Sequence, residues 1–328
     1  MNVVIGGNGF VGGRLCKLLK SKGFDYVVID KESVEPDQTA FIEADVRDVD
    51  ALKEAINPDD TIINLSAEHR DDVRPRSLYD EVNVQGARNI CQVASEKSVK
   101  QIIFTSSVAV YGFAAPNTGE DGKINPFNDY GRTKAEAEDV YRTWQAEDPE
   151  VRSLVIIRPT VIFGEQNRGN VYNLLTQIDS GRFVMIGNGR NKKSMAYVDN
   201  VAAFLLESLK FGSGLHTYNY IDKPDFDMNT LVSTVRERLG KGQGVGVRLP
   251  YSLGLLIGYC FDLLSKLTGR SFPISSIRVK KFCATTQLSS SVSDTKFKIP
   301  VSLAEGLSRT VQHEFLEDHS GEKKYYSE

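Results

Sequence analysis

The sequence is poor in the residues that build metal centres, disulfide frameworks and membrane spans. It has four cysteines, far apart in the chain: Cys16, Cys91, Cys260 and Cys283. They form no CxxC pair and no Cys/His ligand spacing, which argues against zinc and against a disulfide scaffold. We therefore expect no metal ion and a reducing compartment, the cytoplasm.

A long apolar run is also missing. The longest uncharged stretch of the C-terminal half, at 249–261, has 13 residues and contains Pro250, whereas a membrane-spanning helix needs about 20 apolar residues. No basic leader precedes the first glycines, so we expect no signal peptide and a fold that begins at Met1. With 41% hydrophobic residues, 25% charged residues and a net charge of -3, the composition is that of an ordinary soluble protein. We expect no nucleic-acid partner.

Short apolar runs alternate with amphipathic segments in the first half of the chain. The expected strands are 2–5, 26–29, 61–65, 101–105 and 153–157, and the expected helices are 10–20, 51–56, 77–96 and 130–144. This alternation predicts an α/β fold, a doubly wound parallel sheet with helices on both faces. Further helices are expected at 200–209, 228–239 and 303–315, in a smaller C-terminal substrate lobe. We expect domains 1–164 and 165–328, with the chain returning to the first near 183–210.

Glycines directly after the first expected strand have the pattern of a phosphate-binding loop. Gly6, Gly9 and Gly12 enclose Phe10 and Val11, at the start of a helix. Glycine permits a tight turn and a close approach of the backbone to a pyrophosphate, which the helix N-terminus then faces. We interpret the segment as a dinucleotide-binding loop; an ordinary glycine-rich turn is the alternative that the pattern alone leaves open.

Carboxylates after the next two strands favour NAD as the dinucleotide. Asp30 ends the second strand, where a carboxylate accepts hydrogen bonds from the adenosine ribose. The same charge would repel the 2'-phosphate of NADP, although Lys31 beside it acts in the opposite direction. Asp45 and Val46, further along the chain, are placed to line the adenine.

A phenol, an ammonium and a hydroxyl form the expected reactive set. Tyr130 and Lys134 are four residues apart, on one face of a helix. Ser107 follows the strand expected at 101–105, at the sheet edge where ligands bind. A phenol has a pKa of about 10 and is a poor base at neutral pH. The ammonium and a positive nicotinamide ring would lower that pKa. Ser107 would hold a substrate hydroxyl while Tyr130 takes its proton.

With these motifs the sequence resembles the extended short-chain dehydrogenase/reductase family, in its NAD-dependent sugar epimerase/dehydratase branch, which has a Rossmann-type sheet. The resemblance covers nearly the whole chain and rests on the glycine loop, Asp30 and the segments 45–48, 64–67, 83–86, 104–112, 130–134, 158–159 and 198–200. It implies that Ser107 and Tyr130 contact the substrate and that Lys134 binds the nicotinamide ribose. The NAD contacts that it implies further are Leu65, Ala67 and Pro159. It also implies a homodimer built from helices at 77–97 and 130–147.

One departure from the branch narrows the reaction. Sugar 4,6-dehydratases carry an Asp-Glu pair after the Ser/Thr, but this sequence has Val108 and Ala109 there. This argues against loss of water and for C4 epimerisation by transient oxidation and re-reduction. The segments 67–72, 106–112, 187–200 and 275–282 resemble the polyprenyl-diphosphate-linked N-acetylglucosamine 4-epimerases of bacterial surface-polysaccharide (O-antigen) assembly. His69 and Arg70 are then placed to face the sugar diphosphate; exposure of this loop pair to solvent is the alternative.

Other functions fit the same residues. A UDP-sugar 4-epimerase, acting on UDP-GlcNAc or UDP-glucose, would use the same set, and so would a reductase of 4-keto sugars, which consumes reduced nicotinamide. A non-catalytic dinucleotide-binding regulator would usually lack an intact Ser107, Tyr130 and Lys134.

Positive charge gathers late in the chain. Residues 241–281 hold seven Lys or Arg and one Asp, a local charge of +6 that leaves -9 for the rest. Within them, 251–267 has an apolar stripe at helical spacing. It packs in the second lobe or, because its flanks are basic, lies on an anionic membrane surface. Arg190 and Arg278 are candidates for the diphosphate of the substrate. We expect peripheral contact with the cytoplasmic membrane if the stripe is exposed.

Overall fold

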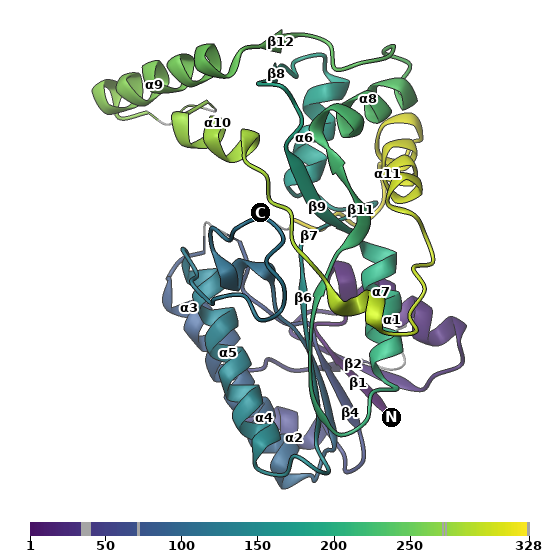
Figure 1. Ribbon diagram of the computed structural model, residues 1–328. Helices are drawn as coiled ribbons and strands as arrows, with labels where there is room; N and C mark the ends of the chain where they lie inside the picture. Colours follow the sequence, from purple (N-terminus) through teal and green to yellow (C-terminus); the bar gives the residue numbers. More distant parts are fainter. Residues whose placement is uncertain (34–40, 71–72, 271, 273, 327–328) are drawn as a thin grey trace.

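The computed structural model describes residues 1–33, 41–70, 73–270, 272 and 274–326. A seven-stranded parallel sheet forms the lower part of the molecule, in the order β10-β6-β5-β4-β1-β2-β3 (Figure 1). Its strands are β1 (Asn2–Ile5), β2 (Tyr26–Asp30), β3 (Phe41–Glu43), β4 (Thr61–Asn64), β5 (Gln101–Thr105), β6 (Ser153–Pro159) and β10 (Gly214–Tyr220). The predicted α/β fold with a doubly wound sheet is confirmed.

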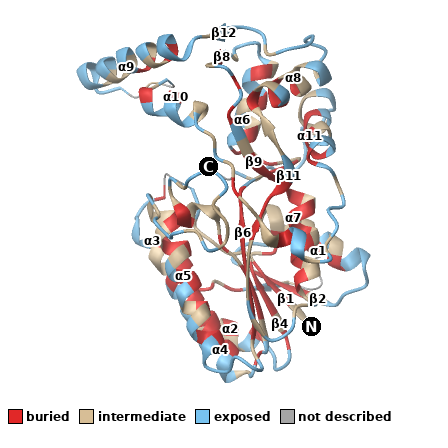
Figure 2. Ribbon diagram, viewed as in Figure 1, coloured by how far each residue is buried: buried red, intermediate tan, exposed pale blue. Residues whose placement is uncertain are grey.

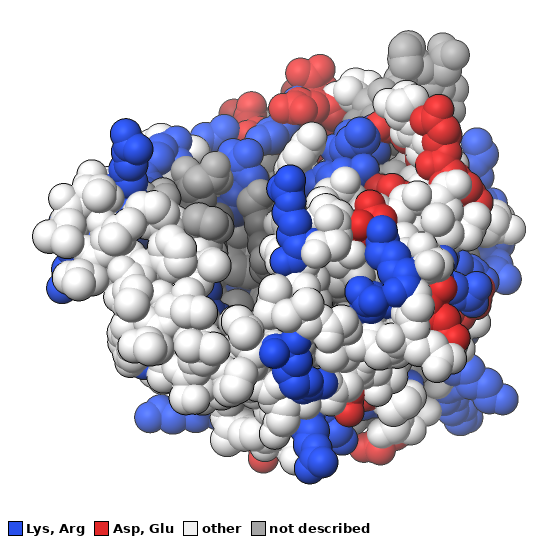
Figure 3. Space-filling model, turned by 90° about the horizontal axis from the view of Figure 1, so that it is seen from above, with Lys and Arg blue, Asp and Glu red and all other residues white. Residues whose placement is uncertain are grey.

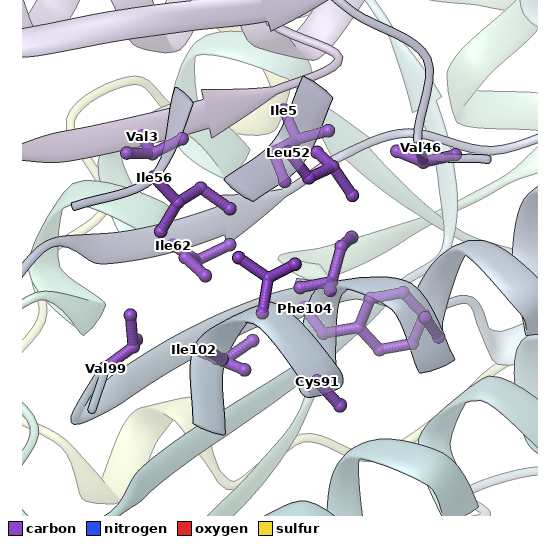
Figure 4. Close-up of a cluster of buried hydrophobic side chains, with 14 of the residues drawn as sticks. Val3, Ile5, Val46, Leu52, Ile56, Ile62, Cys91, Val99, Ile102 and Phe104 are labelled. Carbon is purple, nitrogen blue, oxygen red and sulfur yellow. The ribbon is translucent and has the colours of Figure 1, made fainter. Parts of the chain in front are cut away.

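Helices cover both faces of this sheet. One face carries α2 (Val49–Ala55), α3 (Ser77–Tyr79), η1 (Asp80–Gln85), α4 (Gly86–Glu96) and α5 (Asp129–Ala146), and the other carries α1 (Phe10–Ser21) and α7 (Val198–Ser208). Figure 4 shows the core under α2 and α4, where Leu52 and Cys91 pack against Ile5 and Ile102 of the sheet. Each strand interior is apolar because both of its faces are buried.

The helix expected at 77–96 is continuous, but its second turn is wider than an α-helix. Asp80–Gln85 forms a π-helical segment between α3 and α4. Such segments are rare and occur often at functional sites. Here it carries Asn83, which belongs to the site described below.

The upper lobe is built on a second, smaller sheet. Its strands are β7 (Val161–Phe163), β9 (Lys192–Tyr197) and β11 (Asp222–Asp227), with a short pair β8 (Met185–Ile186) and β12 (Arg248–Leu249) beside them. Its helices are α6 (Asn170–Asp179), α8 (Met228–Arg238), α9 (Tyr251–Thr268), α10 (Ser276–Cys283), α11 (Leu303–Val311) and η4 (Gln312–Leu316). Short 3-10 turns are η2 (Val108–Tyr111) and η3 (Ser291–Asp294). The Ser302 hydroxyl caps α11 by accepting from the Glu305 backbone N–H.

The chain crosses between the two parts more than once. After β9 it forms α7, which packs on α1, and then β10, which pairs with β6 in parallel over seven residues. No strand was predicted from the sequence at the position of β10. The division at residue 164 remains a prediction.

Helix α9 projects from the upper lobe (Figure 1) and is largely exposed along its length (Figure 2). Only Gly254 and Gly258 of its residues are buried. Across the described part of the chain, no helix combines the length and apolar character needed to cross a membrane.

Candidate functional site

The glycine loop joins β1 to α1 and packs too tightly for side chains. A Cβ at Gly12 would lie 2.4 Å from the Gly6 carbonyl oxygen, and one at Gly6 would lie 2.8 Å from the Ser66 nitrogen, at a φ of +77°. No side chain caps the N-terminus of α1 at Gly9, so the first N–H groups of the helix point toward the loop. Backbone donors at a helix N-terminus are the group that a pyrophosphate needs, and the residues present therefore fit a dinucleotide.

Asp30 and Asp45 lie at the carboxyl ends of adjacent strands. The Asn8 backbone N–H donates to Asp30 Oδ2 at 3.0 Å, so the carboxylate is fixed beside the glycine loop. Arg47 donates to both carboxylate oxygens of Asp45, at 3.0 and 2.8 Å, and this hydrogen bonding holds the pKa of Asp45 below its usual value. Val46 is buried beneath Gly86. The roles of these three residues in binding NAD remain predictions.

The segment after β4 lies against the glycine loop. The Leu65 backbone N–H donates to the Ile5 carbonyl oxygen at 2.9 Å. Contact of Leu65 and Ala67 with the cofactor remains a prediction. Asn83 of the π-helical segment exchanges two hydrogen bonds of 2.9 Å with the Glu68 backbone and donates a third to Thr133 on α5. Asn83 belongs to the segment 83–86 of the family resemblance, but no role was predicted for it. The structure shows that it fixes this loop to the helix of Tyr130.

Ser107, Tyr130 and Lys134 come together at the carboxyl edge of the sheet. Ser107 follows β5. Burial raises the pKa of the Tyr130 phenol, and the nearby Ser107 hydroxyl acts in the opposite direction. Burial lowers the pKa of Lys134 to about 7, while Glu138 acts in the opposite direction. The Lys134 ammonium lies 4.4 Å from the centre of the Phe104 ring. A bound cation beside Tyr130 would offset the effect of burial on the phenol.

Beneath this set lies a buried ionic network that the sequence analysis missed. Glu138 accepts from Ser106 Oγ at 2.6 Å and from Arg158 at 2.8 and 2.5 Å. Arg158 also donates to the Tyr111 hydroxyl, which in turn donates to Asn219 of β10. Glu138 follows Lys134 by four residues, so it lies on the same buried face of α5. That spacing was the available signal, but a helical glutamate is usually solvent-exposed.

The remaining predicted residues lie around this centre. His69 and Arg70 follow β4 and are exposed. Asp71 and Asp72, which belong to the same motif, lie outside the described residues. Pro159 is buried at the end of β6.

Arg190 and Arg278 are exposed in the upper lobe, in the β8–β9 loop and on α10. Ser107, Tyr130 and Lys134 belong to the lower lobe. Contact of the two arginines with a substrate remains a prediction.

Comparisons with known proteins bear on the family of this chain. A model of the "NAD dependent epimerase/dehydratase family" matches residues 2–220. A relative from Escherichia coli O157:H7, named N-acetyl-alpha-D-glucosaminyl-diphospho-ditrans,octacis-undecaprenol 4-epimerase, is 50% identical over 330 residues, covering 99% of this chain and 98% of its own. The UDP-glucose 4-epimerase of Vibrio cholerae is 28% identical, over 94% of both chains.

Solved structures share the fold at low identity. UDP-N-acetylglucosamine 4-epimerase from Bacillus cereus matches with a TM-score of 0.74 at 15% identity, covering 97% of both chains. Thermus thermophilus UDP-glucose 4-epimerase, solved in complex with NAD, matches with a TM-score of 0.68 at 19% identity, covering 95% of this chain and 98% of its own. At these identities the likeness concerns the fold alone.

Proposed function

The chain belongs to the NAD dependent epimerase/dehydratase family, and from this we propose that it is an NAD-dependent 4-epimerase of an N-acetylhexosamine carried on polyprenyl diphosphate. It would interconvert the GlcNAc and GalNAc forms. The observation that carries the proposal is the identity of 50%, over nearly both full chains, with a relative named as acting on that class of lipid-linked sugar. Bacterial surface-polysaccharide (O-antigen) assembly, on the cytoplasmic side of the membrane, is the proposed setting.

The reaction needs one base and a held sugar. Tyr130 would take the proton of the C4 hydroxyl while Ser107 holds that oxygen, since the Ser107 hydroxyl lies close enough to the phenol to affect its pKa. Lys134 would bind the ribose and add positive charge beside the phenol. Held by the glycine loop, NAD would supply the acceptor for the C4 hydride and would give the same hydride back to the other face of the sugar ring, so it would not be consumed. Tyr130 would return its proton to the C4 oxygen.

The side chains near Ser107 favour epimerisation over dehydration. Val108 and Ala109 occupy the first turn of η2, and neither side chain can transfer a proton. Removal of water from a sugar needs an acid and a base beyond the one that acts at C4. The chain therefore lacks, at these positions, the groups that a 4,6-dehydratase uses.

Helix α9 supports the lipid carrier because its large side chains face outward. A Cβ at Gly254 would lie 2.5 Å from Ile186, and one at Gly258 would lie 2.8 Å from the Ser276 backbone, so the glycine face packs on the protein. The exposed fractions of Leu256, Leu263 and Leu267 are 59%, 60% and 75%. A soluble protein rarely leaves a continuous apolar face in water without a binding role. We propose that this face enters the surface of an anionic membrane.

Basic side chains surround the arm of the upper lobe that α9 and α10 form. Figure 3 shows uncharged atoms over the end that α9 forms, with Lys and Arg atoms around its margins. Those on α9, on α10 and between them are Lys266, Arg270, Arg278, Lys280 and Lys281. Basic residues near an anionic lipid surface each contribute about 1 kcal/mol.

The arm is joined directly to the rim of the reactive site. Lys281 of α10 lies 5.1 Å from the centre of the Phe127 ring, three residues before Tyr130. Phe127 stacks on Phe113 at 4.8 Å, and both rings are more than half exposed. A substrate whose lipid end lies in the membrane under α9 would therefore pass these two exposed rings before its sugar reaches Tyr130.

A direct comparison of carriers tests the proposal. Purified protein with NAD is incubated with polyprenyl-diphosphate GlcNAc in vesicles and with UDP-GlcNAc, and the C4 epimers are separated. We expect conversion of the lipid-linked sugar without added reductant. Conversion of UDP-GlcNAc alone would identify a nucleotide-sugar epimerase. A need for stoichiometric NADH or NADPH would identify a 4-keto-sugar reductase instead.

A homodimer through α4 and α5 is the proposed assembly. The two helices lie side by side along one edge of the lower lobe (Figure 1), as the family resemblance requires for such an interface. Light scattering on the purified protein measures the mass. A mass equal to one chain at micromolar concentration would refute the dimer.

A further inference from the structure

Two exposed phenylalanines lie beside the reactive set. Phe113 and Phe127 are 73% and 53% exposed, and their rings stack with centroids 4.8 Å apart and planes at 29°. Phe113 follows the C-cap of η2, the turn that Ser107 caps. Phe127 precedes the N-cap residue of α5 and is separated from Tyr130 by three Cα steps of about 3.8 Å each. The ring pair therefore joins the two segments that carry the reactive hydroxyls.

The loop between the two rings is anchored, so their exposure is a property of the fold. The Asn125 backbone N–H donates to the Val110 carbonyl oxygen at 2.9 Å. The Glu120 carboxylate accepts from backbone N–H groups of β10 and η3, at 2.9 and 2.8 Å. Contiguous exposed apolar side chains mark binding sites more often than single ones do. The ring pair is such a patch.

The α9–α10 arm reaches the ring pair. Lys280 lies 5.4 Å from the ring centre of Tyr259 on α9, whereas Lys281 lies 5.1 Å from that of Phe127. One side of α10 is thus turned toward α9 and another toward the lower lobe. Ile277, which is 53% exposed, precedes Lys281 by four residues and lies on the same side of the helix. Figure 1 shows α10 between α9 and the lower lobe, so exposed apolar side chains follow one another from the arm to the reactive set.

We propose that Phe113 and Phe127 bind the first isoprene units of the polyprenyl carrier, the part of the lipid next to the diphosphate. The inference rests on the proposed function, in which the sugar carries such a lipid. With C4 of the sugar at Tyr130, C1 and its diphosphate lie across the sugar ring, and the chain beyond them has to leave over the rim of the site. Lys281 pairs with no carboxylate among the described residues and puts a positive charge beside the rings. A diphosphate joined to an apolar chain needs that combination.

The ring pair suits an isoprenoid chain better than a nucleotide base. The two rings stack on each other, so a base would have to separate them to enter between them. Their outer surfaces offer neither a hydrogen-bond donor nor an acceptor. A uracil covering them would leave polar groups without partners, which is unfavourable once water is excluded. A branched hydrocarbon needs only apolar contact area, and a phenylalanine offers about 150–250 Å² of it.

Two water-soluble substrates measure the contact. The protein with NAD is given GlcNAc linked through diphosphate either to farnesyl, a short isoprenoid, or to methyl, and kcat/KM for each is determined by separating the C4 epimers. We expect the wild type to prefer the farnesyl substrate. The ratio of the two kcat/KM values should fall at least about tenfold in the double variant Phe113→Ser, Phe127→Ser, since covering one large apolar side chain changes affinity by about that factor.

Two control variants separate a lipid contact from general damage. Phe113→Leu combined with Phe127→Leu keeps apolar surface at both positions and should retain most of the ratio. Phe24→Ser removes a phenylalanine that is 43% exposed before β2, at the opposite edge of the sheet, and should keep the ratio of the wild type. Titration with NAD checks that every variant is folded.

The outcomes distinguish this inference from the function on which it rests. A wild type that converts UDP-GlcNAc but neither diphosphate analogue would refute both. A wild type that converts both analogues, with the same ratio in the serine variant, would overturn the isoprene contact alone. An equal loss with the farnesyl, methyl and UDP substrates would overturn it too, and would assign the rings to the sugar or the diphosphate. A smaller mass of the serine variant by light scattering, with an unchanged ratio, would assign them to a contact between two copies of the chain.

Discussion

Glu138 and Arg158 form an ion pair whose side chains are both only 3% exposed, with Nη2 and Oε2 2.5 Å apart. Glu138 belongs to α5 and Arg158 to β6, so the pair joins the helix of Tyr130 to the strand beside Ser106. A charge in such a place is tolerated only while its partner is present.

Replacing Glu138 should therefore be costly. Glu138→Gln leaves the Arg158 guanidinium buried without a countercharge, and we expect a loss of about 3–5 kcal/mol in the free energy of unfolding. Urea denaturation measures it. Glu136→Gln is the matched control, because Glu136 lies exposed on the same helix and exposed pairs contribute about 0–1 kcal/mol. Equal losses for the two variants would contradict the prediction.

Tyr130→Phe should abolish turnover and spare the cofactor. The ring still packs, but no group remains to take the proton, and general-base catalysis contributes about 100- to 10,000-fold. Epimerisation rates and NAD titration measure the two effects. Tyr218→Phe, on β10, removes a phenol outside the site and should keep full activity. Unchanged turnover in Tyr130→Phe would rule out the mechanism.

Asp30 should make the protein prefer NAD to NADP. A 2'-phosphate would lie beside the carboxylate that Asn8 holds in place, whereas Asp30→Ala removes that repulsion. Both cofactors are titrated into the wild type and the variant in a calorimeter. The ratio of the dissociation constant of NADP to that of NAD should be smaller in Asp30→Ala than in the wild type. Equal affinities in the wild type would mean that Asp30 does not contact the ribose.

The buried ammonium of Lys134 should make stability depend on pH. Its pKa is lowered to about 7 in the folded protein, against about 10.4 when unfolded, so the unfolded chain binds more protons between these values. The free energy of unfolding of the NAD-free protein should thus rise with pH in that range, by at most about 1.4 kcal/mol per pH unit from this group. Lys134→Met should lose this slope. Urea denaturation of both proteins at pH 7, 8 and 9 measures the effect. If the difference in their free energies of unfolding does not change with pH, Lys134 is not the source of the slope.

The exposed face of α9 should bind anionic vesicles. Leu256, Leu263 and Leu267 changed together to Ser should weaken co-sedimentation with anionic vesicles at least about tenfold, since burial of a leucine contributes about 1.5–3 kcal/mol. The control changes Val151 and Leu215, exposed by 48% and 45% on the lower lobe, to Ser. NAD binding should be unaffected in both. Equal sedimentation of both variants would refute a membrane role for α9.

Sequence periodicity predicted the elements whose interiors are uniformly apolar. Ile102 and Ile103 of β5 are both fully buried, so the strand is a continuous apolar run. By contrast, β10 contains His216 and Thr217, because it lies at the edge of the sheet and these two positions are only partly buried. It therefore gave no strand signal.

The site was predictable only where a residue type is diagnostic. The glycines of the loop and the spacing of Tyr130 and Lys134 fix their places at the sheet edge. Glu138 carries no such signal, because its partners Ser106 and Arg158 are distant in sequence. For α9, periodicity predicted the helix but not which face is covered. That depends on Gly254 and Gly258 lying against neighbours that only the fold brings close.

The pairing of β10 with β6 makes the two parts of the molecule depend on each other during synthesis. All seven residues of β6 are buried, yet the strand that covers its outer edge is made more than fifty residues later. Until then, a nascent chain exposes a row of unpaired backbone donors and acceptors on an apolar strand, a known template for aggregation. A fragment ending at residue 164 would keep that edge open permanently, so it should be found in inclusion bodies when expressed alone.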